Sequence, residues 1–599
     1  MRSRIRASVL AVVSGLALLA FLAPPASAQF PQFQVSHFGA DDDPATGAQL
    51  AELSFNTRTN QYLVVYIAGS RATSDDEDHW NVFGQRVDAG GVPVGSPIQI
   101  NAPTTNLLCD FEPPSVAYNR KTNQWMVVWD EGTATDCDDA IYSQLVDANG
   151  NLVGPLSQRI SATGFTDIET DPIVYNSTAD EFFAVWTAVG PGQTPQNLFG
   201  QRLTSAGAEV GTDDNQLTHF TGTNSSADDA AGVAYDSKNQ RYLTVVRGID
   251  DGLIGNTNDE IFGHLMSTDG SPIGPDRFRI SHVSDTNPTG NAKPASVAYD
   301  PINDRYLVAW TGNPDIGPMA PNENEVFAQL VGSDGSLLAP ADLRISNVGP
   351  DGNASFVAVR PSIAFNKFTG QYLLDWSGTN DTEGGVLDES EIWGQAVAAD
   401  GTDVGSSDFR ISHDGPDGDV NFAAGRANLA FNPVSCQNMT VWHTGDLANM
   451  FGGDDEKINV FGNLLPATSC PPPTIAKKGK AKVKKKGSRF VVKPGISVTC
   501  PDIEDCTVQE TVKTKGGGGK ASQAKKKGKK LTVATATATI PLAATQKLSF
   551  KLTKKGSKLL RKRGKLKLKV PVTAQIGTGG SPVAATKKVQ IKAPRGKHH

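Results

Sequence analysis

Two acidic segments of the sequence carry the oxygen ligands that hard cations prefer. The candidate ligands are Asp41, Asp42, Asp43, Asp414, Asp417 and Asp419. Calcium binds clustered carboxylate and carbonyl oxygens, although the spacing here differs from that of an EF-hand loop. The alternative interpretation is a pair of solvated acidic loops that aid solubility. The sequence therefore predicts calcium as a candidate ligand, and we expect the protein to require no cofactor.

Sugar chemistry is the second candidate. Glycoside hydrolysis needs two carboxylates about 5 to 9.5 Å apart, and acidic loops could supply such a pair. Arg247, Arg360 and Arg426 could bind an anionic sugar, while the competing interpretation pairs them with neighbouring acids. The sequence contains no His-Glu-x-x-His zinc motif, serine nucleophile elbow, phosphate-binding loop or dinucleotide fingerprint. No catalytic residue is assigned.

The charged residues are segregated along the chain of 599 residues. Of 56 Lys and Arg and 63 Asp and Glu, the segment from Pro471 onward holds 33 and 4, a balance of +29. The remainder, without the three arginines near the N-terminus, has a balance of −39. The formal charge of −7 thus hides two oppositely charged parts. The composition excludes a wholly disordered chain, a collagen and a multi-span membrane protein.

The first 28 residues have the pattern of a secretory signal peptide. Three arginines precede an apolar run over residues 9–22, and Ala26, Ser27 and Ala28 form a small-residue cleavage site. No later stretch approaches the ~20 apolar residues of a membrane helix. We expect a secreted protein, extracellular or associated with the cell surface, with no transmembrane segment.

One phrase recurs seven times and defines a repeat. Its copies are residues 81–87, 140–146, 197–203, 260–266, 325–331, 391–397 and 459–465. Its aromatic residue advances from Phe83 to Phe461 in six steps that average 63 residues. Two apolar strands precede each copy, and a hairpin turn such as Asn-Gly or Asp-Gly follows it, because these residues supply the positive φ of tight turns. The pattern predicts four antiparallel strands per repeat.

Seven such units predict a seven-bladed β-propeller over residues 29–470, within an all-β chain. The seventh unit has only three strands, whereas residues 33–37 match an isolated fourth strand. We therefore expect the N-terminal strand to complete the last blade. The units resemble propeller-type repeats of secreted bacterial surface proteins, in the form AYNxxxNxYLVVW, IFGQxVDAxGxxVG and FRIS. This resemblance implies the fold and no activity.

Six cysteines in an exported chain can all be paired. The expected strand order places the first two on one face of the propeller and the next two on the other, and the last two remain as a third pair. The predicted disulfides are Cys109–Cys137, Cys436–Cys470 and Cys500–Cys506.

The basic part begins with a Pro- and Lys-rich linker, residues 471–488, and continues with strand-like alternation over residues 489–599. Seven short strands in about a hundred residues predict an immunoglobulin-like β-sandwich. The phrases VTCPxxxDCTV and LTKKGSKLLRKRGKLKLKV resemble lysine-rich sandwich modules at the ends of secreted actinobacterial proteins, which implies fold and context. Nucleic acid is not an expected partner, because Phe490 and Phe550 are the only aromatic residues in this part.

These observations favour a non-enzymatic secreted binding or scaffold protein. Its acidic propeller face would bind a ligand or calcium, and its basic domain would associate with an anionic cell-envelope polymer or glycan. The alternative is a polysaccharide-active hydrolase or lyase with its site at the mouth of the propeller channel. A third hypothesis is that the acidic propeller and the basic sandwich bind one another.

Overall fold

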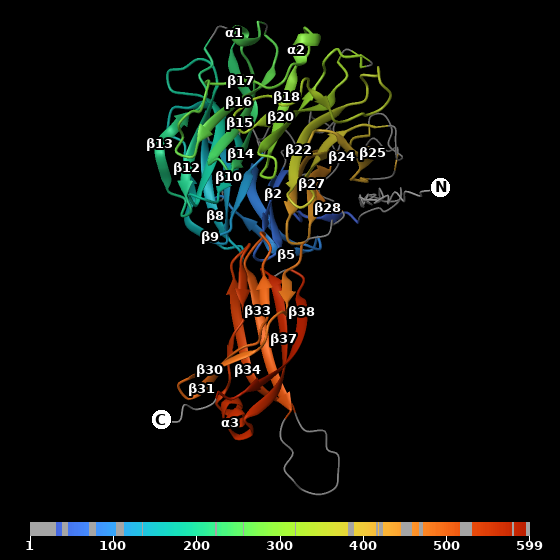
Figure 1. Cartoon of the computed structure of the whole chain (residues 1–599). Helices are drawn as coiled ribbons and strands as arrows, with labels where there is room; N and C mark the ends of the chain where they lie inside the picture. Colours follow the sequence, from blue (N-terminus) through green and yellow to red (C-terminus); the bar gives the residue numbers. More distant parts are fainter. Residues whose placement is uncertain are drawn as a thin grey trace, which may run out of the picture.

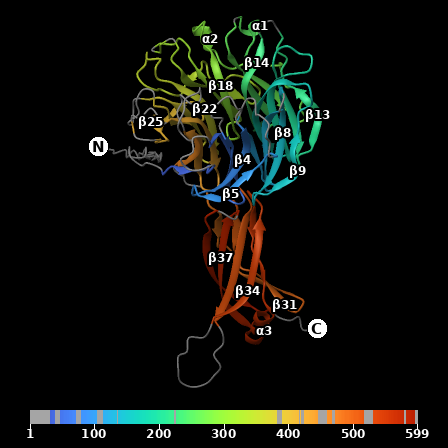
Figure 2. The same cartoon turned by 180° about the vertical axis from the view of Figure 1, so that it is seen from behind.

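The repeated strand pattern folds into consecutive antiparallel sheets. The computed structural model describes residues 31–38, 46–70, 79–102, 113–133, 136–221, 225–255, 257–317, 319–320, 322–380, 389–414, 417, 423–444, 458–465, 471–515, 530–577 and 580–594. It shows an all-β chain in two parts, a β-propeller and an elongated domain below it (Figure 1 and Figure 2). No helix of the described residues is long and apolar enough to cross a membrane. The predicted signal peptide lies outside these residues.

The described residues of the propeller part form seven four-stranded sheets. Six of them follow the chain order: β2 (Thr46–Asn56), β3 (Gln61–Ser70), β4 (His79–Asp88), β5 (Pro93–Gln99); β6 (Ser115–Asn119), β7 (Gln124–Thr133), β8 (Asp136–Asp147), β9 (Leu152–Arg159); β10 (Thr166–Asn176), β11 (Glu181–Val189), β12 (Asn197–Thr204), β13 (Glu209–Gln216); β14 (Ser226–Asp236), β15 (Arg241–Ile249), β16 (Glu260–Ser267), β17 (Phe278–Arg279); β18 (Ala292–Asp300), β19 (Arg305–Gly312), β20 (Glu325–Gly332), β21 (Leu343–Arg344); β22 (Ala358–Asn366), β23 (Gln371–Gly378), β24 (Glu391–Ala398), β25 (Asp403–Arg410). The seventh joins β26 (Ala424–Asn432), β27 (Gln437–Thr444) and β28 (Asn459–Leu465) to β1 (Phe33–Gln34). Two short helices, α1 (Asp251–Ile254) and α2 (Val283–Thr286), lie in the connections.

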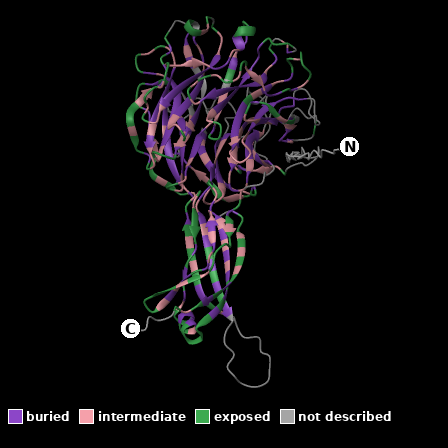
Figure 3. Ribbon diagram, viewed as in Figure 1, coloured by how far each residue is buried: buried purple, intermediate pink, exposed green. Residues whose placement is uncertain are grey.

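The first strands of the seven sheets form the innermost layer. Each contacts the first strands of the two neighbouring sheets, and β2 contacts β26, so the layer closes on itself around an axis. The second strands lie next to it and are almost wholly buried, as the colouring of Figure 3 shows. The tryptophans at their ends, among them Trp186, Trp310 and Trp442, are fully buried and belong to the core.

The turn between the first and second strands is held by the same bonds in every sheet. An Asn or Asp at the end of the first strand accepts hydrogen bonds from the backbone N–H groups two and three residues later. These residues are Asn56, Asn119, Asn176, Asp236, Asp300, Asn366 and Asn432. Such side chains favour turns because they replace a backbone acceptor. The aromatic-Asn/Asp pair of each repeat therefore specifies its turn.

A second repeated bond joins the third and fourth strands. A backbone N–H near the start of the third strand donates to a side-chain oxygen just after the fourth strand. The acceptors are Asn101, Ser161, Thr218, Ser281, Ser346, Ser412 and Ser36. Ser36 follows β1 and accepts from Val460 over 2.8 Å. The N-terminal strand thus completes the sheet of the last repeat, as expected.

The C-terminal domain pairs its strands into three sheets. Its elements are β29 (Thr474–Ala476), β30 (Lys482–Lys486), β31 (Arg489–Lys493), β32 (Ser497–Thr499), β33 (Cys506–Lys515), β34 (Lys530–Ile540), β35 (Thr545–Lys547), β36 (Phe550–Lys551), α3 (Lys554–Arg563), β37 (Lys565–Ile576) and β38 (Val583–Lys592). The sequence did not predict α3, which begins at the N-cap Thr553 and ends at Gly564 in the left-handed conformation. The sequence pattern predicts strands over residues 547–552 and 566–572 and assigns no element to the segment between them.

The predicted linker, residues 471–488, differs from the structure. It contributes β29 and β30, and β30 pairs along its whole length with β31. The reason is the alternation of Val483 with lysines, which gives the period of a strand despite the high charge. Val483 is half-buried, whereas the lysines of β30 are exposed. The lysines of β30 made this strand look like a linker in the sequence.

The disulfide between Cys500 and Cys506 is present, as predicted. Cys436 is buried and disulfide-bonded, but its partner is outside the described residues. The predicted positions Cys109 and Cys470 lie outside the described residues, and nothing is described of the side chain of Cys137.

The two parts meet at the turns that connect first and second strands. Glu504 is almost fully buried there, accepts a hydrogen bond of 2.6 Å from Thr57, and lies 3.8 Å from both Arg58 and Arg120. Gly577 lies so close to this turn that a Cβ would be 2.8 Å from the carbonyl oxygen of Thr57. At this contact the C-terminal domain supplies the acid and the propeller supplies the bases, the reverse of their overall charges.

Candidate functional site

Two arginines occupy irregularities of the innermost strands. The pairing of β22 with β23 and that of β26 with β27 both slip at the same point of the repeat. Arg360 and Arg426 lie in these bulges with φ of 57° and 50°, a left-handed conformation that is uncommon for residues other than glycine. Bulges redirect side chains and are over-represented next to active sites. Both arginines lie near the start of their strands, at the end of the axis opposite to the C-terminal domain.

Two more basic residues join them from neighbouring sheets. Lys293 lies near the start of β18, and Arg247 lies near the end of β15. Partial burial, together with the positive charges of Arg247 and Arg360, lowers the pKa of Lys293. We call Arg247, Lys293, Arg360 and Arg426 the basic arc. It takes one residue from each of four consecutive sheets, so only the closed propeller assembles it.

Among the described residues, the two exposed members of the basic arc have no acidic partner. Lys293 and Arg360 are exposed, and neither has an ion-pair partner in the part of the chain that the structure describes. The competing sequence interpretation, in which the arginines pair with acids, therefore does not hold for Arg360 within that part. Like charges held together raise the local free energy, and a bound anion would relieve it.

A neutral histidine adjoins the basic arc. His443 in β27 pairs with Gly425, is 4% exposed, and neither ring nitrogen has a hydrogen-bond partner among the described residues. Burial and the charges of Arg426 and Arg360 lower the pKa of His443 to about 3. The ring is therefore uncharged at neutral pH.

Buried carboxyl groups occur elsewhere in the inner strands. Burial raises the pKa of Glu52 to about 7, against the hydrogen bonds from Ser115 and Val116 that favour its charged form. Burial also raises the pKa of Asp375 to about 7, against a hydrogen bond from Thr440. None of these partners belongs to the basic arc. Among the described residues, no pair of carboxylates is identified beside the arc.

The described calcium candidates bind other side chains. Asp414 is buried, accepts hydrogen bonds from Trp442 (2.7 Å) and Gln32 (2.8 Å), and burial raises its pKa to about 6. Asp417 is exposed and forms an ion pair of 2.7 Å with Arg410. Asp41, Asp42, Asp43 and Asp419 lie outside the described residues. No group of three or more His, Cys, Asp or Glu among the described residues could hold a metal ion, and calcium binding stays a prediction.

The role of Asp417 follows from the repeat. In each of three sheets a buried Glu at the start of the third strand accepts from an Arg of the fourth strand, and the same Arg pairs with an Asp of the following loop. The three sets are Glu260, Arg279 and Asp285; Glu325, Arg344 and Asp351; and Glu391, Arg410 and Asp417. Asp417 therefore occupies a recurring structural position.

Sequence reasoning missed Lys293 and His443, although aligned repeats contain the signals. Lys293-Pro294 and Arg360-Pro361 are the same dipeptide type near the start of a first strand. Arg247 and His443 both follow the last aromatic or aliphatic position of the second strand. In most other repeats this place holds a small polar residue such as Thr311.

Comparisons with known proteins bear on the fold. No protein-family model matches the sequence, and no curated protein matches it. Among solved structures, the chain is similar to the Hadza microbial sialidase Hz136 (10% identity, 58% of this chain and 66% of that chain, TM-score 0.36). It is also similar to the Penicillium chrysogenum α-L-arabinanase complexed with arabinobiose (10%, 60% and 96%, 0.38) and to the polysaccharide lyase Uly1 (9%, 74% and 95%, 0.40). These are likenesses of a β-propeller fold.

The expectation of a non-enzymatic scaffold is corrected by this finding. The structures found are those of a sialidase, an arabinanase and a polysaccharide lyase, which agree with the alternative drawn from the sequence. A site assembled from separate repeats would leave no local motif in the sequence. The likeness assigns neither substrate nor catalytic residue to this chain.

Proposed function

We propose that this chain is a polysaccharide-active enzyme, a hydrolase or lyase, that holds an acidic sugar at the basic arc. In this proposal the fold is a seven-bladed propeller closed by its N-terminal strand, followed by an immunoglobulin-like sandwich, and the protein is secreted. The observation that carries the proposal is the convergence of Arg247, Lys293, Arg360 and Arg426 beside the neutral His443.

The arc supports recognition of a carboxylate or sulfate on the sugar. Arginine presents a planar fork that binds such groups through two hydrogen bonds, and lysine adds a mobile point charge. An anion placed between Lys293 and Arg360 would offset the repulsion that lowers the pKa of Lys293. Neutral polymers would gain nothing from this arrangement.

The arc favours elimination over hydrolysis. Neutralising the carboxylate of a uronic acid makes the neighbouring C–H bond more acidic, which assists removal of that proton by a base. Most glycoside hydrolases use a carboxylate pair, and the described residues identify none beside the arc. We therefore expect unsaturated sugar products.

Incubation with a panel of acidic and neutral polysaccharides tests the proposal. We expect cleavage of a uronate-containing polymer, detected by the ultraviolet absorbance of the unsaturated product, and no cleavage of neutral polymers. New reducing ends without that absorbance would identify a hydrolase. No cleavage of any acidic polymer would contradict the proposal.

Substitution of the arc provides the second test. Arg360→Gln with Lys293→Gln should lower kcat/KM about tenfold or more, because each lost charged hydrogen bond to substrate costs about 1.5 to 3 kcal/mol. Lys238→Gln is the matched control, since Lys238 is exposed in a turn at the far end of the axis and pairs only with Asp304 among the described ion pairs. Equal losses in both variants would place substrate binding elsewhere.

A further inference from the structure

The outer face of one hairpin in the C-terminal domain is a regular array of cations. β30 and β31 pair Lys482 with Lys493, Lys484 with Val491, and Lys486 with Arg489, so all six side chains share one face. Lys551 of β36 lies opposite Val491 and extends the array. Alternate residues of a strand are about 6.6 to 6.8 Å apart. The three lysines of β30 therefore form a row with a repeated spacing.

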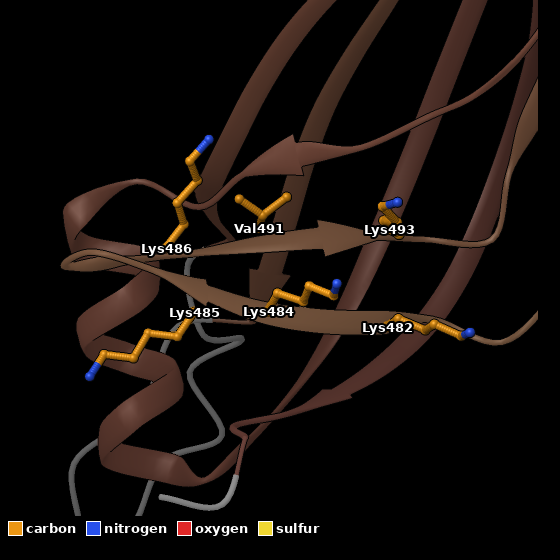
Figure 4. A pocket seen from close by; sticks show the side chains of 6 residues that line it. All are labelled: Lys482, Lys484, Lys485, Lys486, Val491 and Lys493. Carbon is orange, nitrogen blue, oxygen red and sulfur yellow. The ribbon is translucent and has the colours of Figure 1, made fainter.

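This array opposes folding. Lys482 faces Lys493 and Lys486 faces Arg489 directly across the ladder, and like charges in such positions destabilise a sheet. All five lysines of the face are exposed, and none forms an ion pair in the part of the chain that the structure describes. Figure 4 shows Lys482, Lys484, Lys486 and Lys493 around a hollow of about 410 Å³, with Lys485 directed away from the others.

The acids that could neutralise the array lie elsewhere. Of the four acids after Pro471, Asp502 and Glu504 contact the propeller, Asp505 is their sequence neighbour, and Glu510 is buried in β33. The hairpin lies toward the opposite end of the domain, near α3 (Figure 1 and Figure 2). Three of these four acids thus lie at or beside the contact with the propeller. We call the cationic face of the β30–β31 hairpin, with Lys551, the basic pole.

The surroundings of the array distinguish between polyanions. Insertion into a membrane surface needs exposed apolar side chains, but the exposed large hydrophobic residues of the described chain all belong to the propeller. Single-stranded nucleic acid needs aromatic stacking, but Phe490 and Phe550 are buried. Lysine is a common phosphate ligand and binds as a point charge, without the planar two-bond geometry that arginine offers to carboxylates and phosphates alike. Five of the six cations on this face are lysines.

We infer that the outer face of the β30–β31 hairpin, extended by Lys551, binds a linear phosphate polymer carried on a surface. The basic pole and the basic arc lie at opposite ends of the molecule, because the C-terminal domain contacts the propeller at the turns farthest from the arc. A molecule held by the basic pole would present the arc outward. This inference does not depend on the proposed enzymatic activity.

Titration of the full chain with sodium polyphosphate at several salt concentrations tests the inference. The triple variant Lys482→Gln, Lys484→Gln, Lys493→Gln should bind about tenfold to hundredfold more weakly. The slope of the logarithm of affinity against the logarithm of salt should become shallower by about two, from about 0.7 for each lost contact. Unchanged affinity in this variant would overturn the inference.

The matched control is Lys565→Gln, Lys567→Gln, Lys569→Gln, which removes the same charge from exposed positions of β37. We expect the control variant to retain most of the affinity. Equal losses in the two triple variants would show that polyphosphate binds through the overall positive charge and not at a defined face, which would overturn the inference. Tighter binding to polygalacturonate, or equal binding to anionic phospholipid vesicles, would also overturn the inference.

Arg360→Gln with Lys293→Gln should leave polyphosphate binding unchanged, which separates this face from the basic arc. Circular dichroism confirms folding of each variant.

Discussion

Buried charged side chains have different surroundings in the two parts. In the propeller, Glu391 is buried between Arg410 and Ser412, and burial raises its pKa to about 7 although these partners favour the charged form. In the C-terminal domain, Glu510 lies at a core position of β33 between Val508 and Val512. Neither oxygen of Glu510 has a hydrogen-bond partner among the described residues. An unpaired buried carboxylate costs folding energy, whereas a paired one is partly compensated.

Glu510 should therefore destabilise the domain above neutral pH. Burial raises its pKa to about 7 from an ordinary 4.5. The folded state binds the proton more tightly than the unfolded state, so its contribution is most favourable below pH 4.5 and is lost as pH rises through about 7. Glu510→Leu should raise the unfolding free energy at pH 8 by about 2 kcal/mol and flatten its pH dependence between pH 5 and 8. Thermal unfolding across that range measures both effects.

The exposed neighbour Gln509 supplies the control for that substitution. Gln509→Leu adds the same side chain to β33 on its solvent face, where we expect a change within about 0.5 kcal/mol. A Glu510→Leu variant that unfolds more easily at pH 8 would show that the carboxylate is stabilised in the fold.

At the scale of elements, β1 joins the sheet of the last repeat across the longest sequence separation among the propeller's strand pairs. β1 pairs with β28, and Val35 donates a backbone hydrogen bond to Val460. Gln32 also accepts a hydrogen bond from the backbone of His413 in the preceding repeat. These contacts join both ends of the repeat array in one sheet.

Removal of residues 29–38 should destabilise the whole propeller rather than one sheet. Without β1, β28 becomes an unpaired edge and the closing contacts are lost. We expect a lower melting temperature and protease cleavage near the last repeat. Ser36→Ala removes only the bond to Val460 and should cost about 1 to 3 kcal/mol. If the deletion is no more harmful than Ser36→Ala, closure contributes little to stability.

At the scale of the molecule, the contact around Glu504 (the junction) sets the orientation of the C-terminal domain relative to the propeller. Glu504 contacts Thr57, Arg58 and Arg120 from two repeats. Glu504→Gln removes the negative charge that faces these arginines; because Arg58 and Arg120 are 39% and 31% exposed, we expect a loss of about 1 kcal/mol. Small-angle X-ray scattering should then show a broader distribution of interatomic distances, as the two parts lose a fixed orientation.

Asp502→Asn is the control for the junction. Asp502 lies in the same loop and contacts Lys367, but its side chain is 68% exposed, and such pairs contribute little. Scattering curves that coincide for all three proteins would show that Glu504 does not hold the junction.

The repeat explains how much of the fold could be predicted. The aromatic-Asn/Asp turns and the alternation of β-branched residues act locally, so the all-β class and the four-stranded antiparallel sheets could be inferred from the repeated segments. β30 and α3 were missed because lysine runs obscure periodicity. Cys500 and Cys506 were paired correctly because they were the two cysteines that remained after the four cysteines of the propeller segment had been paired.

Charge segregation and the repeat were thus properties of the sequence alone, since both depend on residue types in order along the chain. Only the tertiary structure brings the residues of the basic arc together. Arg247, Lys293, Arg360 and Arg426 are separated by 46, 67 and 66 residues, and no local rule brings them together. Closure of the inner strands around one axis does so, because each sheet contributes one side chain to the same end of that axis. The junction at Glu504 has the same origin, because its acid and bases come from parts of the chain that meet only after both have folded.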